Sequence, residues 1–266
     1  MDSSITKNAG RFTGFADIYD QARPAMPFYP VRIIRTYLGR KPQRVVDLGC
    51  GTGLSSLVWK GQCDELIGIE PSDDMLAVAR LKETEGLSFR KGFSGATGLE
   101  NASVDAVVCS QSFHWMEPES TLAEVNRILK PGGVFATVDC DWPPVSHWQA
   151  EKAYTELFTK VLEIEETNPD VRDSFVRWNK EGHLANMRRS GIFTYAREIV
   201  FFNTETCTSE RLIALAKSQG GLQTILKKAP ELIEKDLHAF EKVVSGLFGS
   251  DEFDIDFGYR MRVGVK

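Results

Sequence analysis

Cysteine and histidine patterns of the kind that bind zinc are missing from this sequence. The five cysteines are an odd number, are scattered along the chain and mostly lie among apolar residues. No C-x-x-C pair or Cys/His spacing typical of a metal site occurs. We therefore expect buried free thiols, and the sequence indicates no metal ion.

An excess of positive charge is also missing. The 266-residue chain carries 32 Lys and Arg against 37 Asp and Glu, a net charge of −5, and no basic stripe is visible. Proteins that bind nucleic acid usually show a basic balance or a basic stripe. We therefore expect no nucleic-acid partner.

Long apolar runs are absent as well. No stretch approaches the length that crosses a bilayer, and the polar residues 1–12 lack the apolar region of a signal peptide. These absences predict a cytoplasmic protein with no membrane partner. The sequence indicates no particular oligomeric state.

The first half of the chain alternates strand-like and helical segments, which predicts right-handed βαβ units and a parallel sheet covered on both faces. The second half is mostly helical and predicts a cap. We divide the chain into an N-terminal helical segment that covers the cofactor (1–40), a cofactor-binding α/β core (41–141), a helical cap insertion (142–190), and the last two strands with inserted helices (191–266). Segment 51–61 is predicted as a helix, 134–141 as the fifth strand, and 197–206 and 254–266 as the last two strands.

The segment VVDLGCGTG, residues 45–53, carries the clearest ligand signal. Glycines between a strand and a helix let a ligand approach the backbone closely, and a helix N-terminus adds partial positive charge. The spacing G-x-G-x-G differs from the G-x-G-x-x-G of dinucleotide-binding enzymes. Asp47 would repel a pyrophosphate and suits a ligand with an ammonium or sulfonium group. Glu70, at the end of the second strand, can accept hydrogen bonds from ribose hydroxyls.

VVDLGCGTG, IGIEPSDDML and EVNRILKPGG together resemble motifs of class I S-adenosylmethionine-dependent methyltransferases. FADIYDQARPAMP and GATGLENASVDAVVCSQSFHW resemble the small-molecule branch that includes trans-aconitate methyltransferase, the methyltransferase type 11 group. The resemblance implies a doubly wound α/β fold with a seven-stranded, mostly parallel sheet whose last strand is antiparallel. It also implies S-adenosyl-L-methionine as the cofactor and S-adenosyl-L-homocysteine as its product.

The resemblance also assigns roles to single residues. Relatives hold adenine with an Asp that this chain lacks, so backbone groups of Ser94 and Gly95 are expected to replace it. Arg23 either binds the methionine carboxylate or only ties down the N-terminal helix. The full cofactor set is Tyr19, Arg23, Asp47, Gly49, Cys50, Gly51, Gly53, Glu70, Pro71, Ser94, Gly95, Ser110 and Gln111.

His114 is the candidate catalytic base because it lies three residues after Gln111, where the reactive methyl group is expected. The alternative is that His114 only shapes the pocket wall. Trp115 and Trp142 follow strand ends and are expected to line the substrate pocket. We predict in-line methylation of a small molecule, with O-methylation of a carboxylate or hydroxyl favoured over N- or C-methylation. A macromolecular substrate, a non-catalytic S-adenosylmethionine-binding protein and a nicotinamide-dependent oxidoreductase are the alternatives.

Overall fold

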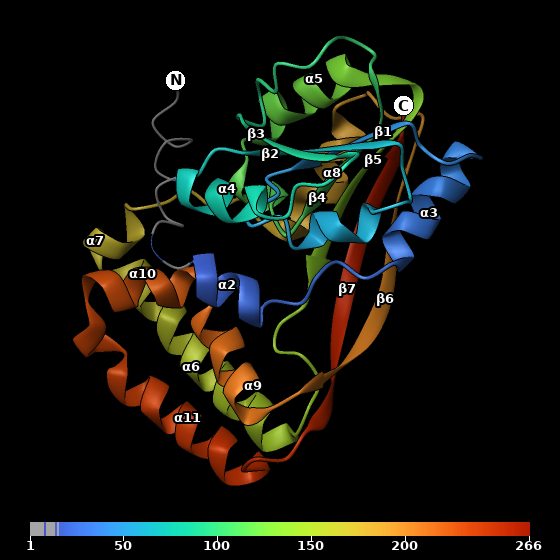
Figure 1. Ribbon diagram of the computed structural model, residues 1–266. Coiled ribbons are helices and arrows are strands. Elements are labelled where there is room, and N and C mark those ends of the chain that lie inside the picture. Colours follow the sequence, from blue (N-terminus) through green and yellow to red (C-terminus); the bar gives the residue numbers. More distant parts are fainter. Residues whose placement is uncertain (1–7, 9–13, 15) are drawn as a thin grey trace.

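A computed structural model describes residues 8, 14 and 16–266 of the chain (Figure 1). Its centre is a seven-stranded sheet in the order β3-β2-β1-β4-β5-β7-β6, in which β7 runs antiparallel to both of its neighbours. This confirms the predicted doubly wound fold with an antiparallel last strand. The strands are β1 (Arg44–Leu48), β2 (Glu65–Glu70), β3 (Leu87–Lys91), β4 (Val104–Ser110), β5 (Leu129–Cys140), β6 (Tyr195–Cys207) and β7 (Phe253–Val265).

The central strands are buried on both faces, which explains their continuous apolar character. Val45 and Ala106 belong to the core that includes α3 and α4, whereas Val46 and Val107 belong to the core that includes α5 and α8. The helices of this part are α2 (Ala16–Ala22), α3 (Tyr29–Leu38), α4 (Asp73–Arg80), α5 (Pro118–Ile128) and α8 (His183–Arg189). The predicted segment 1–40 lies partly outside the described residues, which omit 1–7, 9–13 and 15.

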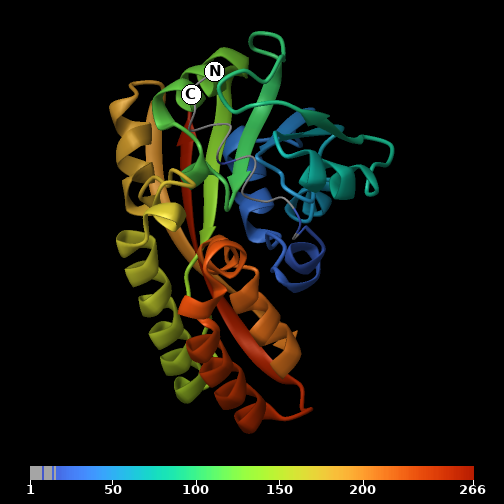
Figure 2. The same cartoon turned by 90° about the vertical axis from the view of Figure 1, so that its left-hand side faces the viewer.

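The remaining helices gather around the far ends of the long strands β6 and β7 (Figures 1 and 2). Helix α6 contacts α7, α10 and α11, and α9 contacts α2, α10 and α11. Helices from the predicted regions 142–190 and 191–266 therefore pack together, and we name this group the cap. Its members are α6 (Trp148–Thr167), α7 (Pro169–Arg172), α9 (Ser209–Lys217), α10 (Gly220–Lys228) and α11 (Glu234–Phe248).

Two local predictions differ from the structure, and one helix was not predicted. The segment after the glycines forms only a short 3₁₀ helix, Ser55–Trp59, so the predicted helix over 51–61 is wrong in kind. Gly53 (φ 76°) and Gly61 (φ 74°) have left-handed backbone on both sides, which confines this segment to the residues between them. Strand β5 begins at Leu129 rather than at 134, and α10 was not predicted at all.

Two further findings concern the composition. All five cysteines are free and buried, as expected. Among the described residues, no helix combines the length and apolar character needed to cross a membrane.

Candidate active site

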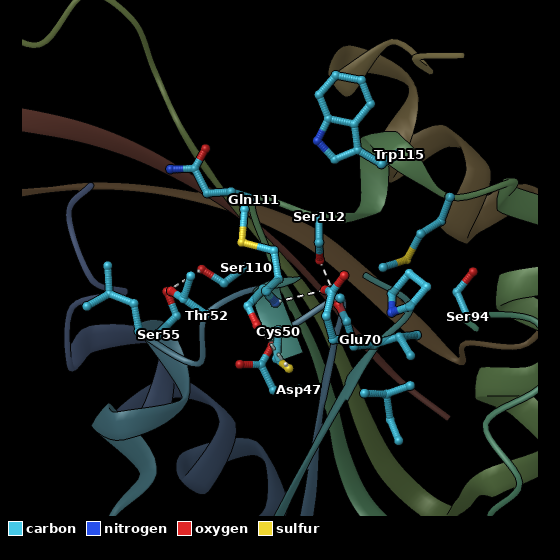
Figure 3. Close-up of a pocket in the computed structure, with 18 of the residues that line it drawn as sticks. Asp47, Cys50, Thr52, Ser55, Glu70, Ser94, Ser110, Gln111, Ser112 and Trp115 are labelled. Atoms are coloured by element: carbon cyan, nitrogen blue, oxygen red, sulfur yellow. Dashed lines mark hydrogen bonds between the residues drawn. The ribbon is translucent and has the colours of Figure 1, made fainter. Parts of the chain in front are cut away.

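A cavity lies at the carboxyl ends of β1, β2 and β4, where ligands bind in open α/β sheets. We name it the strand-end cavity (Figure 3). Gly53 and Gly95 of the predicted cofactor set do not line it. The predicted residues that do line it are Tyr19, Arg23, Asp47, Gly49, Cys50, Gly51, Glu70, Pro71, Ser94, Ser110 and Gln111.

The glycine loop bends along one wall of this cavity. Gly49, Gly51 and Gly53 have φ values of 71°, 56° and 76°, a region that side chains rarely adopt. A Cβ on Gly51 would meet nothing within 4 Å, whereas a Cβ on Gly53 would lie 2.6 Å from the ring of Phe89. Gly51 therefore keeps space open at the cavity, and Gly53 serves the packing of the loop on β3.

Two buried carboxylates lie at the carboxyl ends of the first two strands. Glu70 accepts hydrogen bonds from the Gly51 N–H (2.9 Å) and the Ser72 N–H (2.8 Å), so it fixes the loop and the start of α4. Asp47 accepts a hydrogen bond from the Ser56 hydroxyl (2.5 Å), while its Oδ1 is buried without a partner. Burial raises the pKa of Glu70 to about 7 and that of Asp47 to about 6. No Lys or Arg in the described part of the chain forms an ion pair with either carboxylate, so a cationic ligand fits beside them.

The other end of the strand-end cavity contains the segment predicted to contact adenine. Phe93 and Ser94 line it, and the Ser94 hydroxyl accepts a hydrogen bond from Thr121 (2.8 Å). Gly95 faces helix α5 instead of the cavity, since a Cβ on Gly95 would lie 3.4 Å from the side chain of Ser120. Figure 3 shows Ser94 on the side of the cavity away from Asp47, which gives the cavity two chemically different ends.

A second cavity of about 350 Å³ lies between the sheet and the cap, and we name it the cap cavity. Its size is within the range of small-molecule sites. His114 and Trp142 line it, together with Tyr154 from α6 and Gln219 from the turn before α10. The two cavities share four lining residues and therefore adjoin; these are Tyr19, Arg23, Gln111 and Trp115.

Gln111 and Arg23 mark the junction of the two cavities. Gln111 has a φ of 56°, an unfavourable value for a residue with a side chain, and such strain is concentrated at functional sites. The Arg23 Nη2 donates to the Ser218 carbonyl (3.3 Å) and to the Gln219 side-chain oxygen (3.0 Å). Arg23 thus ties the end of α2 to the cap, which is one of its two predicted roles. Its guanidinium also lies 5.0 Å from the ring of Trp142.

His114 lies at the edge of the cap cavity, next to a buried charge. Its Nδ1 faces Asp139 Oδ1 at 3.5 Å, and the Nζ of Lys180 lies at the same distance from that oxygen. Burial and the charge of Lys180 lower the pKa of His114 to about 3, while Asp139 opposes this shift. Burial alone would raise the pKa of Asp139, but His114 and Lys180 hold it well below its usual range.

His114, Asp139 and His183 come within 4.8 Å of one another, which is close enough for a metal site. However, Asp139 already has two cations beside it, since Arg262 lies at 3.1 Å and Lys180 at 3.5 Å. A divalent ion would add two further positive charges to a buried group that is already balanced. We therefore interpret this group as one that holds His114.

Several lining residues carry no signal in the sequence. Asn8 lines the strand-end cavity and holds Val176 through two hydrogen bonds, donated to its carbonyl (2.8 Å) and accepted from its N–H (2.9 Å). The hydroxyl of Ser112 donates to the Leu48 carbonyl (2.7 Å) across the neighbouring strand. No motif assigns a role to either residue, and each acts through a contact between segments distant in sequence.

The methyltransferase domain model matches residues 46–137. An uncharacterized methyltransferase-like protein of Schizosaccharomyces pombe is 27% identical over 248 residues, which cover 91% of this chain and 90% of that protein. A Saccharomyces cerevisiae protein named as a candidate S-adenosylmethionine-dependent methyltransferase is 33% identical over 124 residues, 44% of this chain and 43% of its own. The structure of a candidate type II methyltransferase from Anaeromyxobacter dehalogenans has a TM-score of 0.64 at 18% identity, and the match covers 91% of this chain and 97% of that chain.

The matched segment 46–137 is a methyltransferase domain, and the protein is a methyltransferase that uses S-adenosylmethionine. The cofactor that the resemblance implies is thereby confirmed. The cavity fits this cofactor on two observations: the buried, unpartnered Asp47 Oδ1 suits a cationic ligand, and the open space at Gly51 admits one close to the backbone.

Alanine substitutions at Gly51 and Gly53 should distinguish a role in cofactor binding from a role in the stability of the methyltransferase. Gly51→Ala adds a methyl group at the open cavity, so we expect cofactor affinity to fall about tenfold, with about 1 kcal/mol lost from the free energy of unfolding through backbone strain. Gly53→Ala adds a clash with Phe89 to the same strain, so we expect a loss of about 3 kcal/mol. Calorimetric titration and urea unfolding measure the two effects. Equal destabilisation by both substitutions would contradict the assignment.

The raised pKa values of Glu70 and Asp47 lead us to expect that cofactor binding by the methyltransferase depends on pH. A sulfonium or ammonium group favours the ionised forms of Glu70 and Asp47, so binding should release protons, and affinity should fall as the pH falls. With the pKa of Glu70 at about 7, we expect S-adenosylmethionine affinity to drop about tenfold from pH 8 to pH 6. Calorimetry in buffers of different ionisation enthalpy measures both the affinity and the protons released. A flat profile without proton release would contradict this coupling.

Proposed function

We propose that this methyltransferase acts on a small molecule, by direct in-line transfer, with the acceptor in the cap cavity. The observation that carries the proposal is the junction of the two cavities at Gln111 and Trp115. An acceptor in the cap cavity would lie next to a cofactor in the strand-end cavity, without any further opening of the fold. Helices α6 and α10 wall the cap cavity, which favours a small molecule over a macromolecular surface.

The proposed cofactor contacts follow from the cavity lining. Glu70 would accept hydrogen bonds from the ribose, Asp47 and the loop 49–51 would lie beside the methionine part, and Phe93 and Ser94 beside the adenine. When bound, S-adenosylmethionine supplies an electrophilic methyl group on a positively charged sulfur. The remaining task of the protein is to align the acceptor and to exclude water, which is the main source of rate in such a displacement.

The proposed acceptor atom is an oxygen, because a neutral base stands beside the cavity. Burial lowers the pKa of His114 to about 3, so its ring is unprotonated near neutral pH but is a weak base. It can take the proton of a hydroxyl group where the charge of Asp139 stabilises the imidazolium that forms. A carboxylate acceptor would need no base, whereas a hydroxyl acceptor would need His114. Trp115 and Trp142 line the same cavity and would pack against the acceptor, which favours one with an apolar or planar part.

Methyl transfer from isotope-labelled S-adenosylmethionine into a cell extract tests the proposal. The extract is separated into metabolites, proteins and nucleic acids after incubation with the enzyme, and label is measured in each fraction. We expect enzyme-dependent label in the metabolite fraction. Label confined to proteins or nucleic acids would exclude a small-molecule acceptor. Tight cofactor binding without any transfer would favour a non-catalytic binding protein.

A further inference from the structure

A row of charged side chains extends across three neighbouring strands and ends at His114. Glu198 on β6 accepts from the Nε of Arg262 on β7 (2.7 Å), and Arg262 Nη1 lies 3.1 Å from Asp139 Oδ2 on β5. Asp139 Oδ1 then faces the Nδ1 of His114 at 3.5 Å. Strand pairing places Glu198 opposite Arg262, so the sheet itself aligns this row of charged side chains toward the cap cavity.

This arrangement is expensive for stability. Arg262 and Asp139 are only 1% and 2% exposed, and burying an ion pair costs more than packing apolar side chains of similar volume. The two oxygens of Asp139 face different groups: Arg262 holds Oδ2, whereas Oδ1 is buried without a formed hydrogen bond and lies 3.5 Å from both His114 Nδ1 and Lys180 Nζ. A charge held in place by Arg262, with one oxygen facing the His114 ring, is suited to orienting that ring.

We propose that Asp139 is the positioning residue for His114: it holds the ring proton on Nδ1 and leaves Nε2 unprotonated toward the cap cavity. The inference rests on the proposed role of His114 as the base. The contact of 3.5 Å is longer than a hydrogen bond, but catalytic contacts in unliganded sites often shorten only when substrate binds. His183 and Lys180 are the other titratable groups that face this pair, and His183 Nε2 is 3.7 Å from Asp139 Oδ2.

The proton balance of the step is simple. As the acceptor oxygen forms its bond to the methyl carbon and the carbon–sulfur bond breaks, the hydroxyl proton passes to Nε2 of His114. The imidazolium then carries protons on both nitrogens, and the negative charge of Asp139 stabilises it without taking a proton. The proton leaves His114 to solvent after the product departs.

The position of the ring proton can be measured without knowing the acceptor. Nitrogen-15 NMR of histidine-labelled enzyme distinguishes protonated from bare ring nitrogens, and the His114→Gln variant assigns the signal among the four histidines. In the wild type near neutral pH, we expect the proton on Nδ1. In Asp139→Asn, Arg262 would attract the amide oxygen, the NH₂ group would face Nδ1, and the proton would move to Nε2.

Asp141→Asn is the matched control, because Asp141 lies just beyond β5 and pairs with Arg260 instead of His114. Its His114 signal should stay unchanged. A wild-type proton on Nε2, or an unchanged signal in Asp139→Asn, would overturn the proposal. The wild-type spectrum decides the matter even if Asp139→Asn does not fold, because a bare Nδ1 cannot donate to Asp139.

Turnover supplies a second readout once the extract experiment yields an acceptor. Asp139→Asn should lower kcat about a hundredfold or more, while S-adenosylhomocysteine affinity stays within about twofold of the wild type. Unchanged turnover would also overturn the proposal. The two failures are distinguishable: absence of any transfer by the wild type counts against the proposed function, whereas the NMR result counts for or against Asp139 alone.

Discussion

Replacing Glu70 with glutamine is expected to weaken S-adenosylhomocysteine binding about a hundredfold or more. The carboxylate accepts from the N–H groups of Gly51 and Ser72 through different oxygens, so it joins the glycine loop to the start of α4. Glutamine has one oxygen, and its NH₂ group would face one of these donors. Hydrogen bonds to a charged group contribute about 1.5–3 kcal/mol each, so losing one inside the site and weakening the proposed ribose contacts accounts for the expected factor.

Calorimetric titration of S-adenosylhomocysteine at pH 8 measures this effect, because most of the Glu70 carboxylate is then ionised. Glu65→Gln is the matched control, since Glu65 starts the same strand and forms a half-exposed ion pair with Arg44. We expect it to bind like the wild type. Thermal unfolding checks that Glu70→Gln remains folded. Wild-type affinity in a folded Glu70→Gln variant would remove Glu70 from the cofactor site.

The features that sequence could predict are those fixed by local rules. The glycines at 49 and 51 are recognisable because a strand must turn there with positive φ beside a ligand. Asp47 and Glu70 are recognisable because parallel strands bring their carboxyl ends to one edge of the sheet. The central strands are recognisable as apolar runs because both faces of these strands are covered.

The features that sequence could not predict depend on contacts between distant segments. Gly53 looks like a ligand-contacting glycine, but it faces Phe89 on β3. Helix α10 starts with two glycines, an unfavourable composition, and it forms because Gly221 lets the helix approach Glu165 and Val161 of α6. Asp139 looks like an ordinary strand residue, and only the pairing of β5, β7 and β6 places a charge behind His114.

Replacing His114 with alanine is expected to lower kcat about a hundredfold to ten-thousandfold with a hydroxyl acceptor, the usual contribution of a general base. Cofactor affinity should change much less, because His114 lines the cap cavity and not the strand-end cavity. The loss therefore belongs to the proton transfer and not to binding. Steady-state kinetics on the acceptor found in the extract, together with S-adenosylhomocysteine titration, measures the two effects separately.

His238→Ala is the control, because the side chain of His238 is 81% exposed on α11 and lines neither cavity. Added imidazole offers a sharper test, since it fits the space left by the ring and can accept the same proton. Partial recovery of His114→Ala turnover, rising with the concentration of unprotonated imidazole, supports proton removal as the lost function. Wild-type turnover without imidazole would instead show that the acceptor atom has no proton to lose, which would leave His114 as a wall of the cavity held in place by Asp139.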